Sequence, residues 1–247
     1  EYTIIFSHDI RDKGPVIIYP NKIDFQQTNI SMQIIPEGTG GFTELLHQRM
    51  VMPFDGSYSE FRHVLRHELV HLFQFDILYD ISLNGFLSPS RYFEFPLWVA
   101  EGQAEYISSG WTEEADMYLS EVIFFGYTYE PEYLGGYLVY KQGQSMMRYM
   151  SKKYGIKKMG ELLRNIRTYP GTSKFTEETI GKDSRDFYRE WLAYEKRRLA
   201  RDFPSRQMPG ETGKNLTDHE KNRSYINMRP ALSPSGTMMS FVSDRRD

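Results

Sequence analysis

The chain has 247 residues, enough for one well-buried domain and part of another, and its 40% apolar and 26% charged residues are typical of a globular protein. A net charge of −3 provides no basic surface for a nucleic-acid backbone, so nucleic acid is an unexpected partner. The absence of cysteine excludes disulfides, thiolate nucleophiles and cysteine-bound metal, so any metal must be bound by His, Asp or Glu.

The first third of the chain alternates short apolar runs with clusters of Gly, Pro and Asp, a pattern typical of a small β-sheet. The strand-like runs are Tyr2–Phe6, Val16–Tyr19, Met32–Ile35 and Arg49–Met52. From Ser57 the apolar spacing becomes helical, and Ser57 with Glu60 forms a capping-box pattern that predicts the start of a helix there.

Further helices are predicted over residues 97–108, 113–125, 136–154, 156–167 and 184–201, several of them ended by Gly or Pro. Strands followed by helices predict an α+β fold. The predicted domain covers residues 1–201 and consists of a small N-terminal sheet followed by a mostly helical part. Residues 202–225 are rich in charge and in helix breakers, and they are predicted to be a linker.

Residues 226–247 contain two strand-like runs around Ser233–Gly236, where Pro234 suits the second position of a tight turn. This hairpin resembles the repeat unit of TolB-like β-propellers, with Ser235 where that family usually has Asp. One repeat cannot bury its own faces, so the resemblance implies a truncated propeller that continues beyond Asp247 and offers a surface to a protein partner. The alternative is a C-terminal hairpin that packs on the main domain.

The segment from His67 to His71 reads His-Glu-Leu-Val-His inside a predicted helix. Its four-residue offset places both imidazoles on one helix face, where two nitrogens can converge on one ion. Apolar neighbours such as Leu69 and Leu72 indicate a buried helix, and buried imidazoles need partners that a Zn²⁺ ion would supply. The alternative is an exposed helix with two solvated histidines.

Catalytic zinc normally has three protein ligands and an open fourth position. The helix that begins after Pro96 carries Glu101 among the small residues Ala100, Gly102 and Ala104, which allow close approach to another helix. Glu101 is therefore the predicted third ligand. Glu105, one turn later, is predicted to hold a ligand imidazole by its N–H, although a solvated carboxylate is the alternative.

The His67–His71 segment together with Trp98-x-x-Glu101-Gly102-x-Ala104-x-Tyr106 resembles the gluzincin metallopeptidases, the thermolysin-like and aminopeptidase-like superfamily. The resemblance implies one Zn²⁺ ion bound by His67, His71 and Glu101. It extends to Phe175–Trp191 near the end of the helical region.

The same resemblance covers Tyr140–Gly143, similar to a Tyr-x-x-Gly element whose tyrosine stabilises the oxyanion of the reaction. Tyr140 is therefore predicted to be catalytic, with Tyr106, Tyr133 and Tyr137 as alternatives.

Two features depart from this family. Glu101 follows His71 by thirty positions, which requires an inserted loop, and Asn84–Gly85 and Ser88–Ser90 provide its turns. The segment Gly40–Glu44 lacks the Met and Asn with which aminopeptidases of the family hold a substrate N-terminus, so an endopeptidase is favoured.

In the expected mechanism Glu68 is the general base and not a metal ligand. A peptide or protein substrate is predicted to add as a strand along Arg49–Pro53. His63, one turn before His67, is expected to be a packed or solvated histidine, with contact to substrate or tuning of the site as the alternative. No sequence context supports a role for the remaining histidines, His8, His47 and His219.

The alternative function is a catalytically silent binding module, with a peptidase fold attached to a propeller. The absence of cysteine and of a targeting segment, with the propeller resemblance, predicts a bacterial periplasmic or secreted protein. No apolar run approaches the roughly 20 residues of a membrane-spanning helix.

Overall fold

The structure is a computed structural model that describes residues 1–11, 13–30, 35–36, 38–45, 47–79, 95–170, 172–202, 212–214, 216–218, 221, 223–224 and 226–245. The chain forms two compact units, Glu1–Arg197 and Arg198–Asp247. Helices and small sheets are both present, which confirms the predicted α+β class. Residues 32–34 of the predicted strand 32–35 and the turns at Asn84 and Ser88 lie outside the described residues, as does much of the predicted linker.

The first unit contains a three-stranded sheet made of β1 (Val16–Tyr19), β2 (Phe42–Glu44) and β3 (Arg49–Pro53). The strand order is β1-β3-β2, with β3 parallel to β1 and antiparallel to β2. The two expected strands at 16–19 and 49–52 are confirmed. The expectation that Arg49–Pro53 offers a free edge is wrong, because this strand is paired on both sides. Among the described strands, β2 is paired on one side only.

The predicted strand at Tyr2–Phe6 is also wrong, because these residues form the short helix α1 (Tyr2–Phe6). Helical spacing places Tyr2 and Phe6 on one face, and both pack against Phe73. Their ring centroids lie 5.9 and 5.4 Å from that of Phe73. This packing overrides the local preference of the apolar run for a strand.

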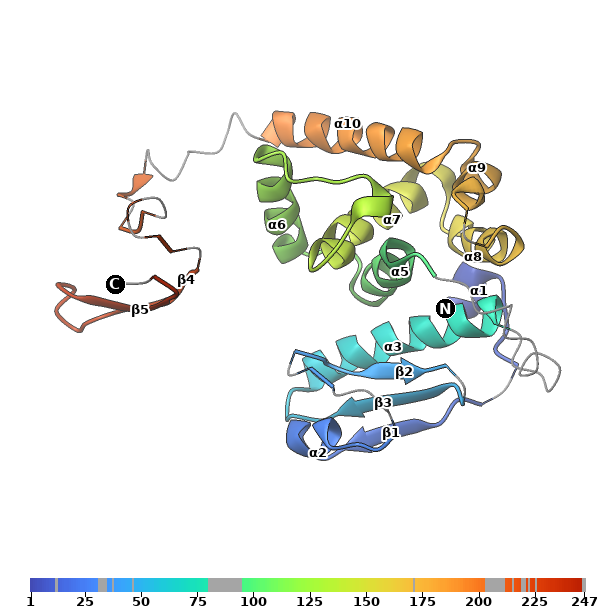
Figure 1. Ribbon diagram of the computed structural model, residues 1–247, viewed down its shortest axis with the longest axis horizontal. Coiled ribbons are helices and arrows are strands. Elements are labelled where there is room, and N and C mark those ends of the chain that lie inside the picture. Colours follow the sequence, from blue (N-terminus) through green and yellow to red (C-terminus); the bar gives the residue numbers. More distant parts are fainter. Residues whose placement is uncertain are drawn as a thin grey trace. The chain divides into compact units, whose positions relative to one another are not determined.

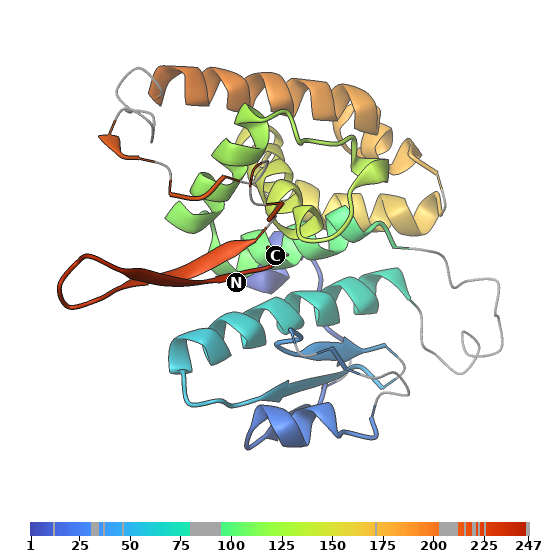
Figure 2. The same ribbon diagram turned by 60° about the vertical axis from the view of Figure 1, so that its left-hand side comes forward.

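Helices cover both faces of the sheet (Figures 1 and 2). Alternate residues of β3 pack against them. Val51 packs with Phe25 of α2 (Lys22–Gln26), a helix capped by the side chain of Asn21. Met50 and Met52 pack on the opposite side with apolar residues of α3 (Tyr58–Leu78). The α3 helix therefore lies between the sheet and the later helices of this unit, whereas α2 covers the opposite face of the sheet (Figure 1).

The remaining helices match the sequence prediction within two residues at each end. They are α5 (Leu97–Ser109), α6 (Glu113–Phe124), α7 (Leu138–Tyr154), α8 (Lys158–Thr168) and α10 (Ser184–Asp202). The predicted start of α3 is confirmed as well, because the Glu60 backbone N–H donates to the Ser57 hydroxyl at 3.4 Å. Helix α2, helix α9 (Lys174–Ile180) and the short 3₁₀ helix η2 (Pro131–Tyr133) were not expected.

Two glycines set the distance between α5 and α7. A Cβ atom on Gly102 would lie 2.6 to 2.9 Å from backbone atoms of Gly143, and a Cβ on Gly143 would lie 2.8 Å from the Trp98 carbonyl oxygen. The small residues around Glu101 thus allow close approach to α7, as well as the packing of α5 on α3.

The second unit contains β4 (Asn227–Leu232) and β5 (Met239–Ser243), which pair in antiparallel orientation. The predicted turn is present, since the Gly236 N–H donates to the Ser233 carbonyl at 2.9 Å. In the part of the chain that the structure describes, no helix is long and apolar enough to cross a bilayer.

Candidate metal centre

Two imidazoles of α3 face each other at the centre of the first unit. The Nε2 atoms of His67 and His71 are 3.1 Å apart, as expected for residues one helical turn apart. Their other ring nitrogens face acceptors, Glu105 for His67 and Gln74 for His71, at 3.2 and 2.8 Å. Each imidazole is therefore oriented by a partner at Nδ1, and its Nε2 faces the Nε2 of the other imidazole.

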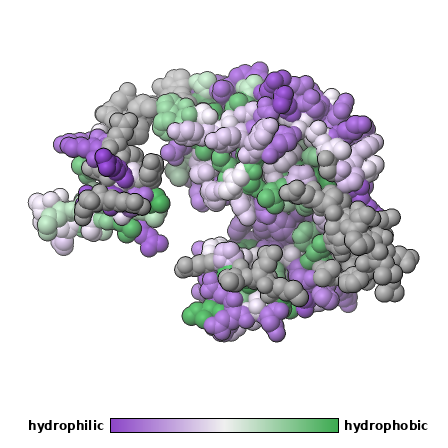
Figure 3. Space-filling model, viewed as in Figure 1, coloured by the Kyte–Doolittle hydropathy of each residue, from purple (hydrophilic) through white to green (hydrophobic). Residues whose placement is uncertain are grey.

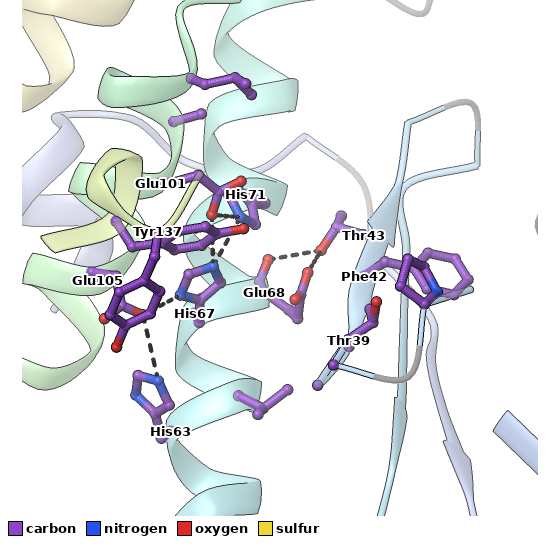
Figure 4. Close-up of a pocket in the computed structure, with 18 of the residues that line it drawn as sticks. Thr39, Phe42, Thr43, His63, His67, Glu68, His71, Glu101, Glu105 and Tyr137 are labelled. Atoms are coloured by element: carbon purple, nitrogen blue, oxygen red, sulfur yellow. Dashed lines mark hydrogen bonds and ion pairs between the residues drawn. The ribbon is translucent and has the colours of Figure 1, made fainter. Parts of the chain in front are cut away.

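Helix α5 adds a carboxylate to this pair (Figure 4). Glu101 Oε2 lies 3.2 Å from His67 Nε2 and 3.5 Å from His71 Nε2. Ligand atoms bound about 2.0–2.1 Å from a tetrahedral zinc ion lie about 3.3–3.4 Å from one another. The three atoms thus form a triangle of the size that such an ion requires, and His67, His71 and Glu101 together could hold a metal ion.

The electrostatics of this triangle favour positive charge. Burial opposes a charged His67, but hydrogen bonds to Glu101 and Glu105 outweigh it and raise its pKa to about 10. Burial also opposes a charged Glu101, whereas its bonds to the two imidazoles lower its pKa to about 2. Bound protons or a metal cation can supply the charge that these groups favour, and the two compete for the same nitrogens.

Glu105 lies behind His67 in a second ion-pair cluster. Its carboxylate is 3.2 Å from His67 Nδ1, 3.5 Å from His63 Nε2 and 2.8 Å from the Lys141 ammonium. Burial opposes its charge, but the bonds from His63, His67 and Lys141 hold the pKa of Glu105 well below its usual value. Glu105 therefore lies at the predicted place, within hydrogen-bond distance of His67 Nδ1.

His63 takes part in this cluster, which differs from the expectation of a merely packed or solvated histidine. Its Nδ1 is 2.8 Å from the Ser109 hydroxyl, and its ring lines the same cavity as the triangle of His67, His71 and Glu101. His63, His67 and Glu105 form a second group that could hold a cation. The Lys141 ammonium already provides positive charge at Glu105, so the first triangle is the better metal site.

Glu68 lies beside the triangle and faces strand β2 (Figure 4). It is buried, and the Thr43 hydroxyl lies 2.8 Å from its Oε2 and 3.0 Å from its backbone carbonyl. Thr43 therefore connects the edge strand to the carboxylate predicted to act as base. The Phe42 ring points away from Glu68 and packs against Phe25.

Two of the candidate tyrosines reach the site. The Tyr140 and His67 rings are roughly parallel, with centroids 6.4 Å apart, and Tyr137 packs on Tyr140. Burial and the negative charges of Glu101, Glu105 and Glu68 raise the pKa of Tyr140 to about 12, so its hydroxyl keeps its proton at neutral pH. Tyr106 and Tyr133 are not among the described residues that line the cavity.

The triangle opens into one cavity of about 740 Å³, which His63, Glu68, Glu105 and Tyr140 also line. Its walls come from β2 and the segment before it, from α3, α5 and the start of α7. Its apolar lining includes Val64, Phe75, Phe95 and Leu97. The surface of this unit is hollowed between the helices above and the strands below (Figure 3). A cavity of this size, with a few convergent polar groups on apolar walls, is typical of a ligand site.

The other histidines have structural partners. His8 is paired with Asp76, and His47 with Glu44, away from the cavity. His219 lies outside the described residues. The sequence reasoning missed Gln74 and the role of Thr43. Gln74 follows His71 by three positions, a spacing that places it on the same helix face, and this was the available signal.

Comparison with known proteins gave no relatives. No protein-family model matches the chain, and no curated protein or solved structure shows significant similarity to it. The function must therefore be argued from the geometry of the site.

Proposed function

We propose that this chain is a zinc-dependent peptidase of the gluzincin type, and that it cuts peptide bonds inside a chain. The observation that carries the proposal is the triangle of His67 Nε2, His71 Nε2 and Glu101 Oε2, with separations of 3.1 to 3.5 Å. A buried carboxylate that is not part of the triangle, Glu68, lies next to it. Three ligands and an adjacent base are the requirements of metal-assisted peptide hydrolysis.

His67, His71 and Glu101 would hold the ion, and Glu105 would keep the His67 ring in place. Bound zinc supplies a Lewis acid that polarises a carbonyl and lowers the pKa of water. Glu68 takes the proton of the attacking water and passes it to the leaving amine. The Tyr140 hydroxyl, which stays protonated, donates a hydrogen bond to the developing oxyanion.

An extended peptide is the substrate that the cavity suits best. Strand β2 forms one wall and is paired on one side only among the described strands, so its other edge can accept a peptide by main-chain hydrogen bonds. Recognition through the backbone tolerates many side chains.

The residues of β2 favour internal cleavage over removal of N-terminal residues. Glu44, at the position where an acidic group could hold a substrate ammonium, is already paired with Arg49 at 3.2 Å and with His47 at 3.1 Å. Among the described residues, Glu44 does not line the cavity. A free N-terminus therefore gains no carboxylate partner from this strand.

The competing function is a silent binding module that kept the fold and its metal ligands. The Thr43 bond to Glu68 favours the enzyme, because it orients a carboxylate that plays no part in holding the ion. The hairpin β4–β5 remains a proposed TolB-like repeat. Its exposed apolar side chains, among them Met228, Leu232 and Val242, are suited to further packing partners.

A peptide-library assay tests the proposal. We expect the purified chain to make internal cuts in a mixed peptide library, to lose this activity with a chelator, and to regain it when zinc is added. Glu68→Gln should bind zinc as the wild type does and lose turnover. Full activity of this variant would remove Glu68 from the mechanism, and zinc binding without any cleavage by the wild type would favour the binding module.

A further inference from the structure

A row of buried amides leads away from His71 on the side opposite Glu101. Gln74 and Gln103 are fully buried, and Gln74 Oε1 lies 2.8 Å from His71 Nδ1. Gln74 Nε2 lies 3.0 Å from the Ala100 carbonyl oxygen and 3.1 Å from Gln103 Oε1. Gln103 Nε2 lies 3.2 Å from the Met159 carbonyl oxygen. The row connects α3, α5 and α8 to one nitrogen of one imidazole.

Two backbone carbonyls fix the direction of these hydrogen bonds, because a carbonyl oxygen can only accept. The Met159 carbonyl requires the NH₂ group of Gln103, whose oxygen is then left to accept from Gln74. The Ala100 carbonyl independently requires the NH₂ group of Gln74. Gln74 can therefore present only its oxygen to His71, so the Nδ1 atom must carry a hydrogen.

We propose that Gln74 and Gln103 are positioning residues that select the His71 tautomer in which Nε2 is free to bind metal. The tautomer follows from the hydrogen-bond directions alone, whereas its role in metal binding rests on the proposed function. With Nδ1 protonated by this constraint, the Nε2 lone pair of a neutral His71 points at His67 and Glu101. The Met159 carbonyl on α8 thus determines, through Gln103 and Gln74, which nitrogen of the His71 ring is free to bind a metal ion.

The two histidines are held by different chemistry, which matches their surroundings. Glu105 can hold His67 as a carboxylate because Lys141 and His63 lie next to it. At Gln74 the described neighbours are carbonyls, an amide and the His71 ring, so a charged group there would be buried without a fixed cation. A neutral amide orients His71 without that cost.

Packing between the three helices does not by itself explain why Gln74 and Gln103 are amides. Apolar side chains of similar size, such as Met, would also fill the space between the helices. They would leave the His71 Nδ1–H without an acceptor in a buried position, so the ring would lose its preferred tautomer. Metal affinity distinguishes the two roles, because it depends on the tautomer while helix packing alone does not.

The test compares zinc affinity in four variants of the full chain, measured by competition with a chromophoric chelator. Gln74→Met should lower the affinity about 10- to 100-fold, the usual cost of losing a group that orients a metal ligand. Gln103→Met should cause a smaller loss, since Gln74 keeps its bond to the Ala100 carbonyl. Gln74→Glu keeps an acceptor at Nδ1 and should bind zinc more tightly than Gln74→Met.

Gln144→Met is the matched control. Gln144 is another buried glutamine, which donates to the Gly110 carbonyl at 2.9 Å and is not among the described residues that line the cavity. Its variant should lose a comparable buried hydrogen bond and keep wild-type zinc affinity. Equal zinc affinity in Gln74→Met and Gln144→Met would overturn the inference.

A second measurement needs no variant and no metal. Two-dimensional ¹H–¹⁵N NMR of the wild type, at a pH where the His71 ring is neutral, should show the hydrogen on Nδ1. A hydrogen on Nε2 would overturn the inference even if zinc binds. A wild type that shows the Nδ1 tautomer but binds no zinc would instead contradict the proposed function.

Discussion

The ionisable residues around His67 should make the proposed metal binding sensitive to pH. Hydrogen bonds to Glu101 and Glu105 outweigh the effect of burial and raise the pKa of His67 to about 10, so the ring holds a proton at neutral pH when no metal is bound. Zinc needs the unprotonated nitrogen, so binding must release this proton. Zinc affinity should therefore increase as the pH rises from 7 towards about 10.

Calorimetry measures this linkage directly. Zinc titrations at pH 8 in buffers of different ionisation enthalpy should show transfer of protons to the buffer. An observed heat that is the same in all buffers, together with an affinity that does not change with pH, would contradict the charge distribution described for this site.

Thr43 is predicted to act on the rate and not on binding. Thr43→Val removes the hydroxyl that bonds to Glu68 and keeps the side-chain shape. Because hydrogen bonds to charged groups contribute about 1.5–3 kcal/mol, kcat should fall about tenfold or more while KM and zinc content stay close to wild type. Thr43→Ser keeps the hydroxyl and should restore most of the rate. A loss that appears in KM alone would show that Thr43 serves substrate binding instead.

The sequence revealed those site residues whose partners are close in the chain or follow a spacing rule. His67, Glu68 and His71 are visible in a single helical turn, and Glu101 and Glu105 follow from the need for a third ligand and its helical neighbour. Contacts between distant elements carry no such signal. Thr43 reaches Glu68 from a separate strand, and the position of Gln103 behind His71 depends on how α5 and α8 pack.

Among the secondary-structure elements, the crossing of α5 and α7 determines where Tyr140 lies relative to Glu101. Gly102→Ala would place a Cβ atom 2.6 to 2.9 Å from the Gly143 backbone, so the helices must move apart. Overpacking of this kind costs about 1–3 kcal/mol. We expect a lower free energy of unfolding in urea and a reduced kcat, since Tyr140 and Glu101 belong to the two separated helices.

Gly135→Ala provides the control for this variant. Apart from Gly135 and its two chain neighbours, no residue has a heavy atom within 4 Å of the position of its added Cβ, so the change should leave stability and activity near wild type. If Gly102→Ala unfolds at the same urea concentration as Gly135→Ala, the close approach of α5 and α7 would not be required.

The longer helices, from α3 onwards, were predictable from the sequence because apolar periodicity and caps are local features. The errors arose where packing between elements decides the outcome. Tyr2–Phe6 has a strand-like composition, yet two of its rings pack on Phe73 only as a helix. Similarly, strand order cannot be read from apolar alternation, so the sequence does not reveal that β1 and β2 flank Arg49–Pro53.

For the whole molecule, the site residues all lie within the unit Glu1–Arg197. Helix α10 belongs to the core of that unit, since the buried Trp191 donates to the Ser145 hydroxyl at 3.0 Å and that hydroxyl lies 3.0 Å from buried Glu195. A cut must therefore follow the end of α10. We expect a fragment of residues 1–202 to fold and to bind zinc with the affinity of the full chain. A fragment that unfolds at room temperature, or binds zinc far more weakly, would show that the second unit is needed.

Zinc content measured after equilibrium dialysis tests the central claim most directly, namely that His67, His71 and Glu101 hold one ion. The wild type should retain one zinc ion per chain at micromolar free zinc, and Glu68→Gln should retain the same amount. His71→Ala and Glu101→Ala should lose it while their circular dichroism spectra remain those of a folded protein. A wild type without zinc, or undiminished zinc in Glu101→Ala, would contradict the account.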